Sequence, residues 1–270
     1  QESTLNCLSN DFNWEMIRRA AMEQSAKDCG CSPEDFEKQE NTVLLSKPLC
    51  GAKKYYTQSF FCQFVSYGNG VVAVADEKVY DFVCQYLQSC RYPFYAFDTP
   101  HLNQISKEMQ KYQKAVCFLA EYFLPDPKSE VITLPGLTIE WLYDQQIEKL
   151  YSDRRFSMAL SYNTEGEKKD RIAAIGFVDG ELAGVAGVSD DCDQLWQVGI
   201  DVLPQFRGRG IAKALTSALT REVFAKGKIP FYCTAWSNLI SKRNAITCGY
   251  RSAWVELSVK DISFTEQMLH

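Results

Sequence analysis

The sequence has little histidine and lacks a paired C-x-x-C motif. Only His101 and His270 occur in 270 residues, and of the eleven cysteines only Cys29 and Cys31 lie close together. Zinc sites use closely spaced Cys and His ligands, so we expect no metal. The cysteine number is odd and the spacing is scattered, unlike the framework of a small secreted domain. This pattern predicts reduced, mostly buried thiols in a cytoplasmic protein.

Long apolar runs and an excess of positive charge are also missing. No stretch is long enough to cross a bilayer, and no signal-peptide pattern is present. The formal net charge of −5 would repel a phosphate polyanion at long range. We therefore expect no membrane and no nucleic-acid partner, although a small anion can still bind at a local basic spot. Hydrophobic residues make up 46% of the chain, enough for a sizeable core.

A proline-rich segment divides the chain. Residues 124–136, LPDPKSEVITLPG, contain three prolines and one glycine. We predict an N-terminal α/β domain at residues 1–126, a linker at 127–136 and a second α/β domain at 137–270. Within the second domain, residues 144–160 are expected to form a helix, and Asp179-Gly180 is expected to join two strands in a hairpin.

The two halves share short sequence elements. PFYAF at 93–97 and PFYCT at 230–234 are each expected to begin a strand, and each is followed by a helix containing ISK, at 105–107 and 240–242. This order suggests that the first half is a degenerate copy of the second. The alternative is coincidence between tripeptides.

The stretch VLPQFRGRGIAKAL, residues 202–215, carries the strongest chemical signal. An apolar strand leads through a proline into Gly208 and Gly210, and an amphipathic helix follows. The N-terminus of a helix has unpaired N–H groups and a partial positive charge, which favour an anion. Arg207, Arg209 and Lys213 add positive charge. We therefore predict a phosphate-binding loop, but not a dinucleotide fingerprint, because Lys213 occupies the position of its third glycine.

Gln205, Gly208 and Gly210 form the pattern Q-x-x-G-x-G between a strand and a helix. This loop resembles the pyrophosphate loop of the GNAT superfamily of coenzyme A-dependent N-acetyltransferases. A second stretch agrees: Asn238, Ser241 and Arg243, followed by Gly249-Tyr250, resemble the penultimate helix of the ribosomal-protein N-acetyltransferase type. The alternative is a glycine-rich turn that binds no ligand.

The resemblance covers residues 137–270 and implies a mixed, mostly antiparallel sheet flanked by helices, with its fourth and fifth strands splayed apart. A second α/β half, considered as a degenerate GNAT-like fold, precedes it. Acetyl-CoA would be the cosubstrate, with its pantetheine arm along 199–202 and its pyrophosphate on 207–212. The residues expected to bind it are Ile200, Val202, Gln205, Arg207, Gly208, Arg209, Gly210, Ile211, Ala212, Asn238, Ser241 and Arg243.

In this family an amine attacks the acetyl thioester directly, so the amine must lose a proton, which it holds with a pKa of about 10. The backbone N–H of Val202 or of Leu203 is the expected oxyanion donor. The tyrosine that many members use as an acid is replaced by Ala245, and the common glutamate base falls near Gln194 or Leu195. Neither of these residues titrates.

Nearby carboxylates are the substitutes for the missing base. Asp201 lies within the cofactor strand, and Asp193 lies in the turn before it, together with Asp190 and Asp191. We take Asp201 and Asp193 as the catalytic candidates. The alternative for each is a turn residue or a structural hydrogen-bond acceptor.

These patterns predict an N-acetyltransferase that moves an acetyl group from acetyl-CoA to a primary amine of a small molecule or a peptide. The missing tyrosine leaves open an inactive protein that binds or senses coenzyme A. A homodimer is one expected option for assembly.

Overall fold

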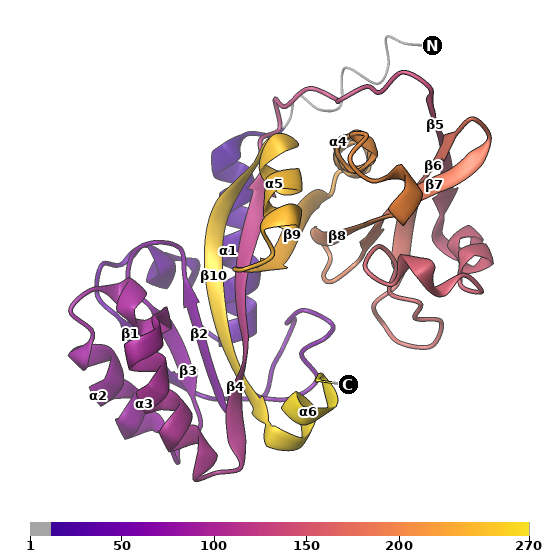
Figure 1. Cartoon of the computed structure of the whole chain (residues 1–270). Helices are drawn as coiled ribbons and strands as arrows, with labels where there is room; N and C mark the ends of the chain where they lie inside the picture. The colour runs from indigo at the N-terminus through magenta and orange to yellow at the C-terminus, as the bar shows by residue number, and fades with distance from the viewer. Residues whose placement is uncertain (1–11, 270) are drawn as a thin grey trace. The chain divides into compact units, whose positions relative to one another are not determined.

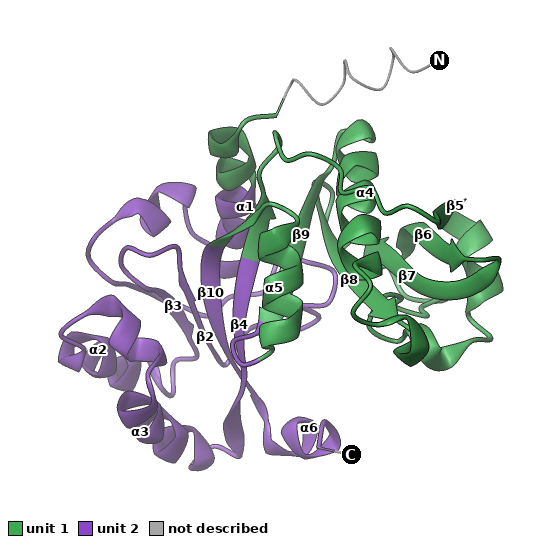
Figure 2. Ribbon diagram, turned by 45° about the horizontal axis from the view of Figure 1, so that its top comes forward, with its two compact units in different colours: residues 1–20, 123–234, 238–252 green, residues 21–122, 235–237, 253–270 purple. Residues whose placement is uncertain are grey.

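The computed structural model describes residues 12–269; residues 1–11 and His270 lie outside it. The chain folds into two compact units (Figure 2). Unit 1 holds the residues up to Ala20, 123–234 and 238–252, and unit 2 holds 21–122, 235–237 and 253–270. The expected boundaries at 126 and 137 differ from this division, because the long strands β4 (Lys114–Pro125) and β10 (Tyr250–Asp261) each contribute to both units.

Unit 1 contains a sheet with the strand order β9-β8-β7-β6-β5 (Figure 1). The pairs β5–β6, β6–β7 and β7–β8 are antiparallel, whereas β8–β9 is parallel. Asp179 and Gly180 both have positive φ and connect β6 to β7 in the predicted hairpin. The strands are β5 (Leu137–Tyr143), β6 (Asp170–Val178), β7 (Glu181–Ser189), β8 (Leu195–Val202) and β9 (Ile229–Ala235).

Helix α4 (Ile211–Ala225) packs on this sheet through the apolar face that the sequence predicts. Ile211, Leu215 and Leu219 on that face are at most 1% exposed, and the helix contacts β6, β7, β8 and α5. This packing points the helix N-terminus at the loop after β8. The other helical segments are α5 (Leu239–Thr247), η4 (Asp144–Leu150), η5 (Arg154–Phe156), η6 (Pro204–Phe206) and α1 (Trp14–Cys29), of which α1 continues into unit 2.

The predicted helix at 144–160 does not form. Two short 3₁₀ turns, η4 and η5, replace it, and an irregular segment follows. Asp153 interrupts the pattern because its carboxylate accepts a hydrogen bond from the Arg155 amide (3.1 Å), a local bond that competes with a helix. The Phe156 amide bonds to the Tyr162 hydroxyl (3.2 Å).

Unit 2 contains strands in the order β1-β3-β2-β10-β4. β1 is parallel to β3, and β2 is antiparallel to both β3 and β10. The new strands are β1 (Thr42–Leu45), β2 (Cys62–Ser66) and β3 (Val72–Ala75). The helices are α2 (Tyr80–Ser89), α3 (Thr99–Gln110) and α6 (Ile262–Gln267), with 3₁₀ turns η2 (Pro33–Glu37) and η3 (Pro93–Phe97). Among residues 12–269, no helix has the length and apolar character needed to cross a membrane.

The strand predicted at 93–97 is wrong. These residues form η3, whereas the matching residues 230–234 lie in β9. The segment connects α2 to α3 and is already turning: the Asp98 amide bonds to Tyr95 O (3.1 Å), and the Asp98 carboxylate caps the Thr99 amide (3.1 Å). The two PFY segments therefore occupy different structures and do not support the duplication.

A buried ionic cluster lies in the core of unit 2. Lys53 is 1% exposed, and its ammonium pairs with Asp28 and, at 3.6 Å, with Glu256. Glu256 also accepts hydrogen bonds from Tyr56 (2.8 Å) and from the Trp254 indole (2.8 Å). The cluster therefore balances much of its own charge and satisfies its polar groups inside the protein.

Candidate functional site

Strands β8 and β9 of unit 1 separate toward their C-terminal ends. Their parallel pairing runs from Leu195↔Ile229 to Val198↔Tyr232, while β8 continues to Val202 and β9 to Ala235. Residues 199–202 of β8 thus extend beyond the last pair, and their backbone groups on that edge can pair with an extended ligand. These are the fourth and fifth strands of unit 1 after the linker, which the resemblance predicts to splay.

The loop after β8 turns through two glycines with left-handed backbone. Gly208 has φ +79° and Gly210, the N-cap of α4, has φ +84°. A Cβ at Gly208 would meet nothing within 4 Å, and one at Gly210 would meet only a Leu134 methyl at 3.9 Å. Backbone conformation, rather than crowding inside the chain, therefore requires glycine, and the space in front of the loop is open to a ligand.

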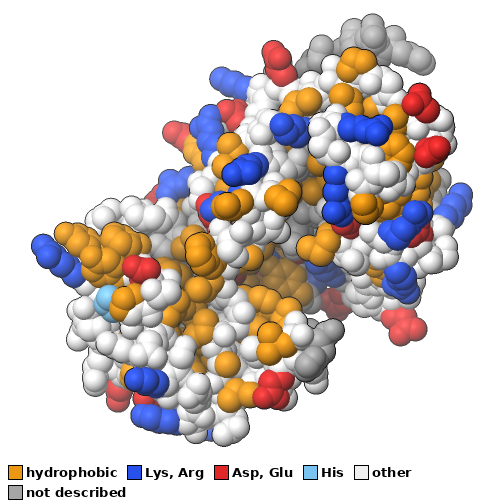
Figure 3. Space-filling model, in the orientation of Figure 1, with side chains coloured by type: hydrophobic (Ala, Val, Ile, Leu, Met, Phe, Trp, Pro, Cys, Tyr) orange, Lys and Arg blue, Asp and Glu red, His pale blue; other side chains and the backbone are white. Residues whose placement is uncertain are grey.

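Basic side chains surround this loop. The Arg207 Nε donates to Val202 O (2.9 Å), and the Arg209 guanidinium lies 5.4 Å from the centre of the Phe206 ring. Arg207, Arg209 and Lys213 are all exposed. Lys and Arg side chains are visible over the region of α4 in the space-filling view (Figure 3). Their charge adds to the partial positive charge of the helix N-terminus.

The structure places the other expected cofactor residues in two groups. Ile200, Val202, Gln205 and 207–212 lie on one continuous strand–loop–helix segment. Ile211 is buried, so only its backbone faces a ligand. Asn238, Ser241 and Arg243 lie on or next to α5, which packs against α4. The Asn238 side chain is committed to capping α5, because it accepts the Ser241 amide (3.1 Å).

Asp201 holds the irregular segment after η5 against β8. Its Oδ2 accepts hydrogen bonds from the amides of Met158 (2.7 Å) and Ala159 (3.0 Å). Burial raises the pKa of the Asp201 carboxyl, while these two hydrogen bonds and the charge of Arg207 act in the opposite direction. The structure therefore gives Asp201 a positioning role in addition to the one the sequence suggests.

The other aspartates lie at the opposite end of β8. Asp193 is exposed and precedes the strand, nine residues before Val202, which is about 30 Å of extended chain. Asp190 pairs with Arg171 (2.6 Å), and fully buried Asp191 accepts from the Ser189 hydroxyl (2.8 Å). This placement argues for structural roles at that end of the sheet.

Tyr232 is a candidate that the sequence reasoning missed. It is the last β9 residue paired with β8, and its hydroxyl accepts from Ser241 Oγ (3.1 Å) and Asn244 Nδ2 (3.5 Å). Burial raises the pKa of Tyr232, so the phenol stays protonated at neutral pH. The replacement of the expected tyrosine by Ala245 was the only available signal; the proximity of Tyr232 to α5 needs the fold.

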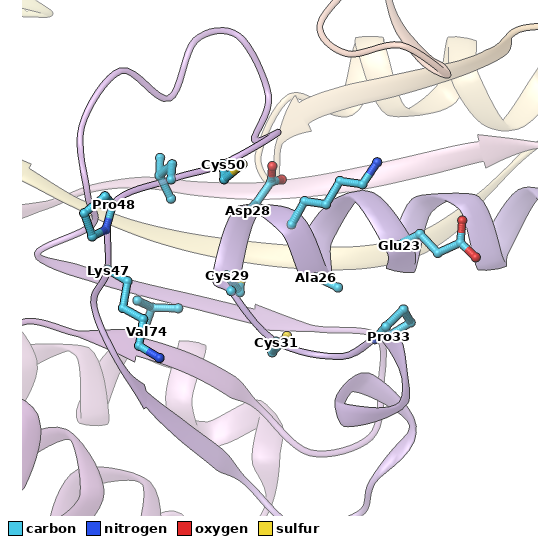
Figure 4. A pocket seen from close by; sticks show the side chains of 13 residues that line it. Glu23, Ala26, Asp28, Cys29, Cys31, Pro33, Lys47, Pro48, Cys50 and Val74 are labelled. Atoms are coloured by element: carbon cyan, nitrogen blue, oxygen red, sulfur yellow. The ribbon is translucent and has the colours of Figure 1, made fainter.

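A cavity of about 460 Å³ lies in unit 2. Cys29 and Cys31, at the end of α1, and Cys50, in the loop before β2, contribute to its lining (Figure 4). Burial raises the pKa of Cys31 to about 12 and that of Cys29 well above its usual value. These two thiols are therefore protonated and poor nucleophiles. Among residues 12–269, no group of Cys, His, Asp and Glu has the arrangement of a metal site.

The loop and its neighbouring strands can be compared with known families. Residues 137–250 match the model of the acetyltransferase (GNAT) family. This match confirms the resemblance predicted for the C-terminal part of the chain. No curated protein matches the chain.

Three solved structures illustrate what this chain is similar to. One is a protein described as a GNAT-family acetyltransferase from Novosphingobium aromaticivorans, with 18% identity and a TM-score of 0.39. The match covers 54% of this chain and 66% of that protein, so the chain spans slightly less than two thirds of its length. Another is the aminoglycoside acetyltransferase AAC(6')-Iy in complex with a CoA-based bisubstrate analogue, with 22% identity and a TM-score of 0.33. This match covers 43% of this chain and 92% of that protein.

The third is a Drosophila protein with 13% identity and a TM-score of 0.44. This match covers 96% of this chain and 96% of that protein. All three TM-scores lie below 0.5.

Proposed function

We propose that the protein is an N-acetyltransferase that moves an acetyl group from acetyl-CoA to a primary amine of a small molecule or a peptide. The junction of β8 and α4 carries this proposal. A strand edge without a β9 partner leads directly into two glycines of positive φ and a helix N-terminus. An extended pantetheine arm suits the strand edge, and a pyrophosphate suits the helix N-terminus with Arg207 and Arg209.

The chemistry requires the amine nitrogen to attack the thioester carbonyl carbon. A C–N bond forms, the C–S bond breaks, and coenzyme A leaves as a thiolate. The backbone N–H of Val202 is the proposed donor to the developing oxyanion. Asp201, with a pKa raised by burial, is the proposed acceptor of the amine proton, directly or through a water.

The thiolate must then gain a proton, and Tyr232 is the proposed source. Its hydroxyl accepts two hydrogen bonds from α5, from Ser241 and Asn244, which leaves its own proton available for donation. Tyr232 would thus supply, from β9, the acid that the family usually carries at the position of Ala245.

A coenzyme A-binding protein without turnover is the second candidate. Ala245 in place of the tyrosine favours it, as do the two backbone hydrogen bonds that already occupy one oxygen of Asp201. Both candidates use the same cofactor loop, so binding alone does not separate them.

Release of free thiol from acetyl-CoA, measured over a panel of primary amines and peptides, tests the proposal. We expect protein-dependent release that requires the amine. Calorimetry with coenzyme A accompanies it: binding without release under any amine supports the second candidate. Absence of both binding and release overturns the assignment of the loop.

A further inference from the structure

Unit 1 holds a polar cavity of about 620 Å³ on the face of the sheet under residues 157–163. Three polar residues form a row across its floor, one from each of three adjacent strands: Asp170 pairs with Ser189, and Ser189 pairs with Gln197. Residues 157–163 cover this face, and their backbone also lies close to Gly199, the next residue after Gln197 on the same face of β8. A Cβ at Gly199 would be only 2.1 Å from Met158 O.

The cavity contains a buried carboxylate, Asp170, that has no counter-ion among residues 12–269. Asp170 is 4% exposed and accepts hydrogen bonds from the Tyr151 hydroxyl (2.7 Å) and the Ser161 amide (3.0 Å). Within the described part of the chain it has no cationic partner at ion-pair distance. Lys168 also lines the cavity, but its ammonium pairs with Asp191 at 3.3 Å.

A buried carboxylate is costly unless a cation compensates its charge. Hydrogen bonds from neutral donors reduce this cost but do not neutralise the charge. The cavity around Asp170 is therefore suited to a ligand that carries a positive charge and hydrogen-bond donors, such as an ammonium group.

The cavity also reaches the separation of β8 and β9. Gln197, Val198 and Gly199 line it, and Val198 is the last β8 residue paired with β9. Gln197 is two strand spacings from Asp170, about 10 Å, and Gly199 lies about 7 Å further along β8. A ligand of roughly 12 Å can thus extend from Asp170 toward the proposed site of acetyl transfer.

We propose that this cavity binds a second, positively charged nitrogen of the acceptor, with Asp170 as its counter-ion. The inference rests on the proposed acetyl transfer and narrows its acceptor to the class of diamines and related molecules with two basic nitrogens. The reactive nitrogen lies at the β8–β9 separation as the neutral amine, while the other remains an ammonium ion on Asp170.

Pairs of acceptors that differ only in the second nitrogen, and whose diamine is long enough to bridge the two places, test the inference: 1,8-diaminooctane against octylamine and 1,9-diaminononane against nonylamine. A charge-assisted hydrogen bond corresponds to about 10- to 100-fold. We expect kcat/KM to favour the diamine by that factor in the unaltered protein. Asp170→Asn keeps an oxygen for Ser161 and Tyr151, and we expect it to abolish the preference by lowering kcat/KM for the diamine to the value for the monoamine. Asp144→Asn, a substitution of an exposed carboxylate, is the charge control and should keep the preference.

Calorimetry of 1,8-diaminooctane with the protein in the absence of acetyl-CoA separates this inference from the proposed function. Binding that is lost in Asp170→Asn supports the cavity assignment even if no amine is acetylated. Equal kcat/KM for both members of each pair in the unaltered protein overturns the inference, whether or not Asp170→Asn folds. A preference that persists in folded Asp170→Asn overturns it as well, and leaves the acetyl transfer standing.

Discussion

Gly210→Asp tests the assignment of the cofactor loop, because it should change both the stability of the fold and the affinity for coenzyme A, and the two effects can be measured separately. The first effect is the cost of backbone strain, because Gly210 has φ +84°. A non-glycine residue in the left-handed region costs about 1–2 kcal/mol of stability. Gly180, in the β6–β7 hairpin, has φ +79° and also has open space around its missing Cβ. Gly180→Asp therefore carries the same strain and the same new charge at a place remote from the loop, and serves as the matched control.

The second cost affects ligand binding alone. A carboxylate at position 210 would lie beside the pyrophosphate of coenzyme A. Two unit charges about 4 Å apart near a protein surface repel by about 4 kcal/mol. This energy corresponds to roughly a thousandfold loss of affinity.

Titration calorimetry with coenzyme A and thermal unfolding of the three proteins measure both costs. We expect both variants to fold, with the smaller loss of melting temperature in Gly210→Asp, because its carboxylate lies at the N-cap of α4. Affinity for coenzyme A should be lost only in Gly210→Asp. A folded Gly210→Asp protein that binds coenzyme A as tightly as Gly180→Asp would refute the assignment of the loop.

Three further outcomes are expected. In Asp201→Asn, kcat/KM should fall about a hundredfold or more. Its pH profile should also lose the inflection that marks ionisation of the Asp201 carboxyl, which lies above the ordinary pKa of an aspartate. Near-full activity with an unchanged pH profile would exclude Asp201 as the base. Because folding raises the pKa of Asp201, the free energy of unfolding should fall as the pH rises from the ordinary aspartate pKa through the raised pKa of the folded protein. Denaturant titrations at several pH values should show this fall in the unaltered protein but not in Asp201→Asn. Tyr232→Phe should lower kcat about tenfold or more at unchanged coenzyme A affinity, whereas unaltered turnover would rule out its acid role. Lys53→Met leaves Asp28 and Glu256 buried without their cation and should cost about 3–5 kcal/mol in urea unfolding; an unchanged unfolding midpoint would contradict the structural role of the pair.

The cofactor loop could be predicted because its signals are local. Positive φ at Gly208 and Gly210 and the apolar face of α4 depend on residue type and spacing within a few turns. The hairpin at Asp179-Gly180 was predictable for the same reason. In each case the neighbouring residues alone determine the backbone conformation.

The acceptor side could not be predicted because distant residues shape it. In the helix expected at 144–160, Asp153 interrupts the pattern locally, but the last residues are held by Asp201, more than forty residues later, which accepts the amides of Met158 and Ala159. Asp170 lines the cavity only because β6 pairs with β7 and β7 with β8. Strand register and loop anchoring of this kind leave no periodic pattern in the sequence.

The strand order of unit 2 has a consequence for how the protein folds as it is made. β10 lies between β2 and β4, and Ser66 pairs with Val255 across about 190 residues of chain. At 5–20 residues per second, roughly ten to forty seconds pass between the synthesis of these two partners. Through that interval β2 lacks β10 and Lys53 lacks Glu256, and β4 lacks β10 from its own synthesis onward. The nascent chain therefore carries unpaired sheet edges during this period, and such edges are prone to aggregation and to chaperone binding.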